Sequence, residues 1–255
     1  MKFKNIIFWC EFPKEIDWEK VSKNLKNKKI RTYIAVNSIQ EYKEYLKKLS
    51  KYKNITIEGA WPTLSFEKGY WFSSFISKES IDKLLEFKDV KIKIDIEPPM
   101  PKENNFFRIF NWCIKYFFLK PKNKSYLYKT LLKLNKEKVI ISTFPFPEFI
   151  LKKYGWSNKF KYYNYMHYST FIPRILKPIY NLYYKSFIKK YGTKNTFYAV
   201  GLLDVGIFRN EPAYKNKKEF TKDLEFLYKQ GVKNIVIFQL NSIQDKISWF
   251  DNLLS

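Results

Sequence analysis

Asp95 and Glu97, two carboxylates separated by one residue, are the side chains of this sequence best suited to chemistry. They close the stretch VKIKIDIE at 90–97, where apolar residues alternate with charged ones until two prolines end the pattern. This period of two predicts a β-strand with one apolar and one charged face. Both carboxylates then lie on one face, about 6.5–7 Å apart, and their repulsion raises the pKa of one of them. Such a pair can hold one member protonated as a general acid while the other stays anionic and orients a substrate.

Lys93 precedes Asp95 on the same face and provides an alternative interpretation. Its ammonium can neutralise Asp95 in a structural ion pair, which is the usual way for a charge to be buried. Glu97 stands at the carboxyl end of the strand, without an obvious partner of this kind. Whether the pair is catalytic or structural stays open at this level.

Strand patterns and helix patterns alternate along the chain. In the segment 38–52, for example, Ser38 is placed to cap a helix, Glu41 occupies the capping-box position, and Ile39 and Leu46 share one face. The predicted strands lie at 4–10, 30–37, 54–61, 90–97, 138–144, 161–170, 195–204 and 233–240, and helical patterns at 17–28, 38–52, 78–88, 173–190, 216–230 and 243–254.

Eight strand-and-helix units in 255 residues predict an α/β fold, a closed (β/α)8 TIM barrel formed by a single domain over residues 1–255. The sequence lacks the GxGxxG turn that would favour an open dinucleotide-binding sheet. An extended helical crossover, about 98–137, is expected after strand four, as packed helices over the barrel or as an interfacial helix.

The alternation in strand four predicts how its side chains are distributed in such a barrel. The apolar residues should pack beneath the helices, and the charged residues should point inside, with the last two at the rim where barrel enzymes hold their active sites. The expected outward set is Val90, Ile92, Ile94 and Ile96, and the inward set is Lys91, Lys93, Asp95 and Glu97.

The KIDIE strand resembles the signature of glycoside hydrolase family 18, in which an Asp-x-Asp-x-Glu strand ends in the proton-donating glutamate. The MHYS stretch is similar to the Met-x-Tyr-Asp motif of that family, with Met166 and Tyr168 in matching positions. The resemblance implies that Glu97 protonates a glycosidic oxygen, that Asp95 positions the acetamide of an N-acetyl sugar, and that Tyr168 hydrogen-bonds this group as it attacks the anomeric carbon. The mechanism is a substrate-assisted exception to the two-carboxylate scheme.

The chain also departs from this family. Lys93 replaces the earlier aspartate, Ser169 replaces the aspartate of the second motif, IEGAW stands where strand three would carry Ser-x-Gly-Gly, and IFQLN lacks the tryptophan of strand eight. The resemblance therefore rests on the barrel framework and on three specific residues.

Further candidates lie at predicted strand ends or in the loop 62–75. Glu58 is a possible second acid or base, with a capping or bracing role as the alternative. Three aromatic side chains of this region, Trp61, Tyr70 and Trp71, offer faces that could stack on sugar rings or pack within the loop. His167 should point away from Tyr168 and serve a structural role. Other polar candidates at the rim are Glu11, Asn37, Ser142, Asp204, Gln239 and Asn241.

The formal net charge of +24 is compatible with binding to an anionic surface, but also with compositional drift that fills exposed positions with lysine. The basic aromatic segments 104–138 and 174–192 lack RNA-binding signatures, so no specific nucleic acid is predicted. Cys10 and Cys113 lack CxxC spacing and are expected to be reduced core thiols, and no metal or cofactor is predicted.

The opening apolar run Ile6–Cys10 is too short for a signal peptide, and no apolar stretch is long enough to span a membrane. These features predict a cytoplasmic protein. Two functional classes follow from the sequence: a glycosidase-like hydrolase using Glu97, or a catalytically inactive barrel that binds a glycan or an anionic surface.

Overall fold

The computed structural model describes residues 1–101, 115–204, 206–207 and 211–254, and its centre is a closed barrel of eight parallel strands. Each strand pairs with its neighbours in chain order, and the last pairs with the first. The predicted (β/α)8 barrel is confirmed. The strands are β1 (Asn5–Cys10), β2 (Ile30–Val36), β3 (Ile55–Pro62), β4 (Ile92–Asp95), β5 (Val139–Thr143), β6 (Tyr162–His167), β7 (Thr196–Val200) and β8 (Asn234–Phe238).

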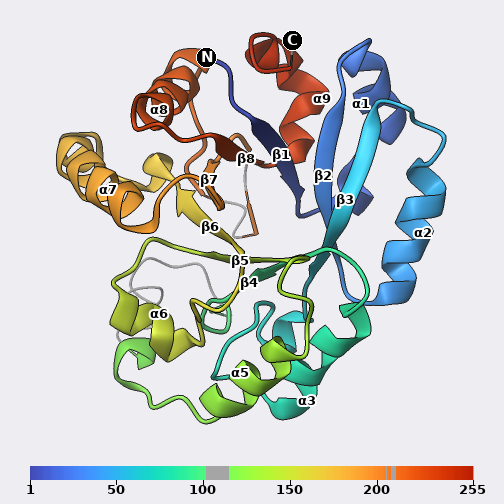
Figure 1. The fold of residues 1–255 in the computed structure, drawn as a ribbon. Coiled ribbons are helices and arrows are strands. Elements are labelled where there is room, and N and C mark those ends of the chain that lie inside the picture. Colours follow the sequence, from blue (N-terminus) through green and yellow to red (C-terminus); the bar gives the residue numbers. More distant parts are fainter. Residues whose placement is uncertain (102–114, 205, 208–210, 255) are drawn as a thin grey trace.

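Helices surround the barrel, as Figure 1 shows. Within the described ranges no helix is both long and apolar enough to cross a membrane. The predicted Ser38 cap forms, since Ser38 Oγ accepts the Glu41 N–H at 3.1 Å. Glu41 in turn accepts the Asn37 N–H at 2.8 Å, one residue before the N-cap N–H that a capping box would use. The α-helices are α1 (Trp18–Leu25), α2 (Ile39–Leu49), α3 (Lys78–Asp82), α5 (Lys124–Leu132), α6 (Glu148–Tyr154), α7 (Lys177–Tyr191), α8 (Lys217–Lys229) and α9 (Ile243–Lys246).

Strand four has the two faces predicted from its alternation. Ile92, Ile94 and Ile96 are fully buried in the large apolar cluster that the strands share with the helices. Lys93 and Asp95 are buried on the other face, inside the barrel. The strand is thus apolar toward the helices and charged toward the barrel interior.

The prediction that Lys91 points inside the barrel is wrong. Its side chain is 56% exposed and pairs with Glu58 at 3.4 Å, because residue 91 precedes β4 and lies at the open amino-terminal end of the barrel. Only the charged residues from 93 onward enter the enclosed part.

The expected helical crossover lies partly outside the described residues. The segment 102–114, which includes Cys113 and the apolar residues Phe106, Phe107, Phe110 and Ile114, is not described by the structure. Of the described part, α5 buries Leu127 and Leu131 against the barrel. Phe117 and Phe118 are exposed, at 46% and 74%, and do not join the core.

Gly59 controls how closely β3 approaches β4. The register of β2 and β3 shifts next to Gly59, and the Ala60 N–H then donates to the Lys91 carbonyl at 2.9 Å. A Cβ at position 59 would lie 2.3 Å from that carbonyl oxygen and 2.6 Å from the Tyr33 ring. Only glycine allows β4 to be held in this position.

We therefore expect Gly59→Ala to reduce the free energy of unfolding by about 3 kcal/mol, at the upper part of the range for overpacking. Gly231→Ala is the matched control: Gly231 follows α8 with a positive φ of 76° but nothing within 4 Å of an added Cβ, so a loss of about 1 kcal/mol is expected. Urea denaturation of the two variants measures the difference, and equal losses would contradict the proposed steric role.

Candidate functional site

A buried ion pair lies at the centre of the barrel. Lys93 Nζ donates to Asp95 Oδ2 at 2.6 Å, and the two side chains are only 1% and 2% exposed. The ammonium also lies 3.2 Å from the centre of the Trp61 ring and 5.1 Å from that of Trp9, within cation–π range. Carboxylate and aromatic faces together compensate the loss of water around Lys93, although burial still lowers the pKa of its ammonium.

Glu97 is fixed in position by its backbone. Its N–H donates to the Phe72 carbonyl at 3.1 Å, and the Ile96 N–H donates to the Ser142 carbonyl at 2.9 Å. Phe72 belongs to the loop after β3, which forms a parallel bridge with Ile96. The loop and β5 therefore hold Glu97 between them, just beyond the carboxyl end of β4.

The environment of Glu97 favours its protonated form. Burial raises the pKa of the Glu97 carboxyl well above its ordinary value, and the charge on Asp95 raises it further, while Lys93 opposes both effects. A raised pKa favours proton donation by a carboxyl at the rim of a barrel, where barrel enzymes hold their active sites.

Glu11, which follows β1, is a second buried acid of this site. Burial and the negative charge of Glu211 raise the pKa of Glu11 to about 8. The Tyr70 hydroxyl donates to Glu11 Oε1 at 3.2 Å. Tyr70 reaches this position because Gly69 and Tyr70 itself adopt positive φ values, which turn the loop back toward β1.

Glu211 is a site residue that the sequence analysis missed. It lies in the long connection between β7 and α8, without a strand or motif to mark it. Its charge nevertheless raises the pKa of Glu11, Glu97 and Tyr168, and a Cβ at Gly206 would lie 2.3 Å from its Oε2 atom. The only sequence signal was a glycine and an acid in one loop, which is too common to be informative.

Tyr168 points into the barrel, as the resemblance implied. It belongs to the interior apolar cluster with Trp9 and Trp61, stacks on Phe238 at 5.6 Å, and contacts Phe144 edge-on at 5.7 Å. Burial raises the pKa of its phenol well above the ordinary value, and the negative charge of Asp95 raises it further. The hydroxyl therefore remains a hydrogen-bond donor throughout the physiological pH range.

Several buried polar atoms around this centre have no hydrogen-bond partner among the described residues. They are both donors and acceptors: Trp9 Nε1, Trp61 Nε1, Glu11 Oε2 and Asp95 Oδ1. An unsatisfied buried polar group costs about 1–3 kcal/mol, so water or a polar ligand bound inside the barrel would stabilise this group of atoms. Across the described part of the chain, no group of three or more His, Cys, Asp or Glu residues could hold a metal ion.

The prediction that Glu58 lies at the rim is wrong. Its carboxylate pairs with Arg31 at 2.6 Å and with Lys91 at 3.4 Å, and Arg31 also donates to Asn5, the first residue of β1. These partners mark the amino-terminal end of the barrel, opposite the rim. Although burial opposes it, the hydrogen bond from Arg31 lowers the pKa of Glu58, as expected for a structural carboxylate.

The remaining candidates from the sequence are placed at or near the carboxyl ends of their strands. Trp71 is half-buried and contacts the Tyr70 ring edge-on at 5.7 Å. Gln239 and Asn241 are buried directly after β8, and Asp204 is half-buried after β7. Their roles as ligand contacts remain predictions. The other two candidates, Asn37 and Ser142, accept hydrogen bonds from Thr63 and Asn164, respectively.

His167 faces the helices, as predicted. Its ring is fully buried and stacks on Tyr180 and Phe226, from α7 and α8, at 5.3 and 5.2 Å. Burial lowers the pKa of His167 to about 4. Asp223 of α8 lies 3.8 Å from the imidazole and accepts hydrogen bonds from Ser169 and Tyr214, so it links the loops after β6 and β7.

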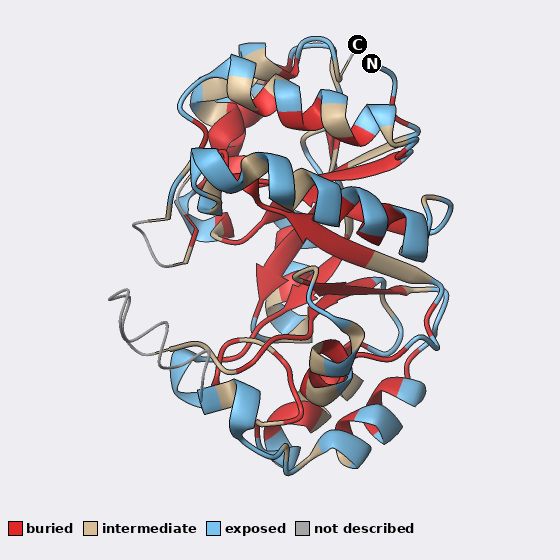
Figure 2. Cartoon of the chain, turned by 90° about the vertical axis from the view of Figure 1, so that its left-hand side faces the viewer, coloured by how far each residue is buried: buried red, intermediate tan, exposed pale blue. Residues whose placement is uncertain are grey.

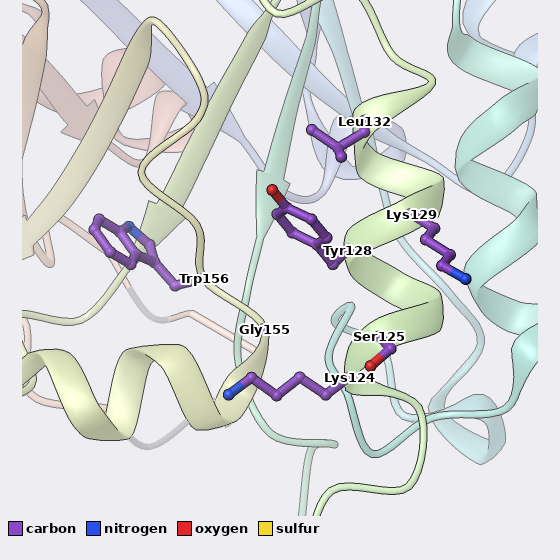
Figure 3. Close-up of a pocket in the computed structure, with 7 residues that line it drawn as sticks. All are labelled: Lys124, Ser125, Tyr128, Lys129, Leu132, Gly155 and Trp156. Atoms are coloured by element: carbon purple, nitrogen blue, oxygen red, sulfur yellow. The ribbon is translucent and has the colours of Figure 1, made fainter.

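A hollow on the outer surface is separate from the barrel interior. It is formed by α5 and by the loop that follows α6 (Figure 3). Its lining contains lysines but none of the acids described above: Lys124, Ser125, Tyr128, Lys129, Leu132, Gly155 and Trp156. It carries no catalytic constellation.

Comparisons with known proteins support the fold. No family model and no curated protein matches this sequence. Among solved structures, the chain is similar to the glycoside hydrolase domain of PgaB (BpsB) from Bordetella bronchiseptica, with a TM-score of 0.59 and 8% identity over 98% of this chain and 99% of that one. It is also similar to an AP endonuclease of family 2 from Brucella melitensis, with a TM-score of 0.53 and 10% identity over the full length of both chains. At these identities the similarity establishes a shared barrel fold.

We expect Lys93→Met to reduce the free energy of unfolding by about 3–5 kcal/mol, because Asp95 would be left buried without its counter-charge. The double variant Lys93→Met with Asp95→Asn removes both charges and should recover most of that loss. Lys91→Met is the control, since its exposed pair should contribute less than about 1 kcal/mol. Chemical denaturation at neutral pH makes the comparison, and a single variant as stable as the wild type would show that the ion pair is unimportant.

Glu11 predicts a dependence of stability on pH. Its pKa is about 8 in the folded state, compared with 4.5 ordinarily. Between these two pH values the folded state keeps a proton that the unfolded state has lost, so stability falls as pH rises from about 4.5 to 8. Glu11→Gln removes this loss, which reaches roughly 5 kcal/mol at 1.4 kcal/mol per tenfold change. The variant should therefore gain stability relative to wild type with increasing pH, and parallel pH profiles of the two melting temperatures would contradict the assignment.

Proposed function

We propose that this chain is a glycoside hydrolase-like barrel that acts on a glycan containing N-acetyl sugars, with Glu97 as its general acid. One observation carries the proposal: Glu97 is a buried carboxyl with a raised pKa, held by its backbone at the carboxyl end of β4, beside the anionic Asp95. A general acid needs a proton at working pH and a fixed position; the raised pKa supports the first requirement and the backbone hydrogen bonds support the second.

Asp95 and Tyr168 have atoms suited to the roles that the family 18 resemblance implies. Lys93 occupies Asp95 Oδ2, and Oδ1 has no partner among the described residues, so it can accept a hydrogen bond from an acetamide N–H. The Tyr168 hydroxyl stays protonated and can donate to the acetamide oxygen as that oxygen attacks the anomeric carbon. Glu97 then gives its proton to the departing glycosidic oxygen, and the glycosidic bond breaks.

The interior tryptophans add binding surface to this proposal. Trp61 and Trp9 present buried indole N–H groups that no described residue accepts, in the same interior cluster as Tyr168. Sugar hydroxyls can accept from such donors, and sugar rings can stack on the aromatic faces. The similarity to a glycoside hydrolase domain is compatible with a glycan as ligand, but at 8% identity it supports only the fold.

A catalytically inactive, glycan-binding barrel is the second candidate. The observation that favours it is the ion pair itself, because Lys93 holds Asp95 at 2.6 Å and its positive charge lowers the pKa of Glu97. If this effect leaves Glu97 deprotonated at working pH, Glu97 has no proton to give to a substrate. The two candidates differ in turnover, not in the ligand.

Glu97→Gln should retain the fold and glycan binding but reduce kcat by about 10²–10⁴-fold, because the amide cannot donate the proton. The assay is hydrolysis of chromogenic N-acetylglucosaminides and other glycosides, with binding followed by calorimetry. In the wild type, the rate should fall as pH rises through the raised pKa of Glu97.

Glu58→Gln is the matched control, because it changes the same group at the opposite end of the barrel and should leave kcat unchanged. Equal activity of wild type and Glu97→Gln would refute the general-acid role. Glycan binding without hydrolysis of any glycoside by the wild type would support the inactive barrel instead.

A further inference from the structure

The outer side of the barrel around α7 exposes large aliphatic residues in an orderly pattern. Ile175, Ile179 and Leu182 are 84%, 66% and 68% exposed, and Leu176 and Tyr183 beside them are 48% and 42% exposed. Spacings of three and four residues place them on one face of the helix and of the turn before it. Exposed apolar residues that occur singly are ordinary, whereas a helical stripe of them indicates an interaction surface.

The stripe continues onto neighbouring elements. The Tyr183 hydroxyl donates to the Pro145 carbonyl, and Lys190 pairs with Glu148, so α7 lies against α6 and the segment before it. Figure 1 shows α6 and α7 on the same side of the molecule, and Figure 2, which views that side, shows helices with largely exposed outer surfaces. There Phe149 is 64% exposed and contacts Phe117 at 6.4 Å. We call this surface the α6–α7 face, and its main apolar residues are Phe117, Phe118, Phe149, Ile175, Ile179 and Leu182.

The positive charge of the chain is concentrated in the same segment. α6, the turn before α7 and α7 itself carry six lysines and Arg174 against a single acid, Glu148. Glu148 is paired with both Lys152 and Lys190. The α6–α7 face therefore combines protruding apolar side chains with a strong excess of basic residues.

The α6–α7 face also borders the open end of the barrel. Phe171, which is 40% exposed, lies in the loop between β6 and α7 and contacts the Tyr168 ring at 6.2 Å. Phe144 follows β5, contacts the same ring at 5.7 Å, and contacts Phe146 at 5.9 Å. A surface bound to this face would therefore lie beside the entrance to the acidic site.

We infer that the α6–α7 face binds the surface of an anionic lipid membrane. Aliphatic and phenylalanine side chains insert at the boundary between headgroups and acyl chains, while the surrounding lysines attract acidic headgroups. RNA would also attract the lysines, but these exposed isoleucine and leucine side chains offer it neither stacking nor hydrogen bonds. The combination of both features matches a membrane better than a polynucleotide.

The position of the α6–α7 face beside the open end of the barrel bears on the substrate, provided that the proposed function holds. If the acidic site cleaves a glycan, the membrane beside its entrance selects glycans attached to lipid or lying on the bilayer. Membrane binding itself requires no catalysis, so the two proposals fail separately.

The test is cosedimentation of the whole chain with two kinds of vesicle, pure phosphatidylcholine and a 70:30 mixture of phosphatidylcholine and phosphatidylglycerol. We expect binding to the mixed vesicles, at least tenfold weaker binding to the neutral ones, and a loss of binding as salt is raised, because screening weakens the attraction. The double variant Ile179→Asp with Leu182→Asp should bind the mixed vesicles at least tenfold more weakly. Leu46→Asp is the matched control, since Leu46 is 39% exposed on the distant helix α2, and should bind as the wild type does.

Thermal unfolding and hydrolysis of a soluble glycoside check that the double variant is folded, and both should be unchanged. The inference is overturned if the wild type does not bind the mixed vesicles, or if the double variant binds them as well as the wild type. It is also overturned if poly(U) RNA binds in preference to the vesicles and the double substitution abolishes only that binding.

Discussion

The ion pair of Lys93 and Asp95 inside the barrel is the interaction on which the site depends. A charge can be buried among apolar side chains only if a counter-charge and hydrogen bonds replace its water. Asp95 and the two flanking tryptophan rings supply these for Lys93. Because the pair uses only one oxygen of Asp95, it leaves the second oxygen facing the interior as an acceptor, and the barrel gains a polar centre without unbalanced charge.

The acids above this pair have raised pKa values first because they are buried and then because negative charges lie near them, while Lys93 opposes both effects. Glu97 and Glu11 are buried near a single ammonium that is already paired with Asp95, so their negative forms are poorly compensated and their pKa values rise. The same crowding would disrupt an ordinary core. At the carboxyl end of a barrel it can be tolerated, because the strands hold these side chains rigidly while the loops above control their access to water.

Charge is distributed unevenly in this protein, and the distribution separates two surfaces. The barrel interior gathers carboxylates, whereas the α6–α7 face gathers lysines around exposed aliphatic residues. The two regions meet at the aromatic residues around Tyr168. A strongly basic chain thus carries an acidic site, so the net charge describes the surface and says little about what enters the barrel.

The sequence by itself determined the architecture and the orientation of strand four, because the periods of apolar residues directly specify strands, helices and their buried faces. It also placed Asp95, Glu97 and the ion-pairing option for Lys93 on one inner face, since these follow from alternation on one strand, whereas Tyr168 was named from the family resemblance. Only the tertiary structure showed that Glu58 lies at the amino-terminal end of the barrel, where the register of β3 shifts and Glu58 pairs with Arg31. Only the tertiary structure showed that Glu211 lies near the acids of the site. Both depend on contacts between residues far apart in the chain, which no local period encodes.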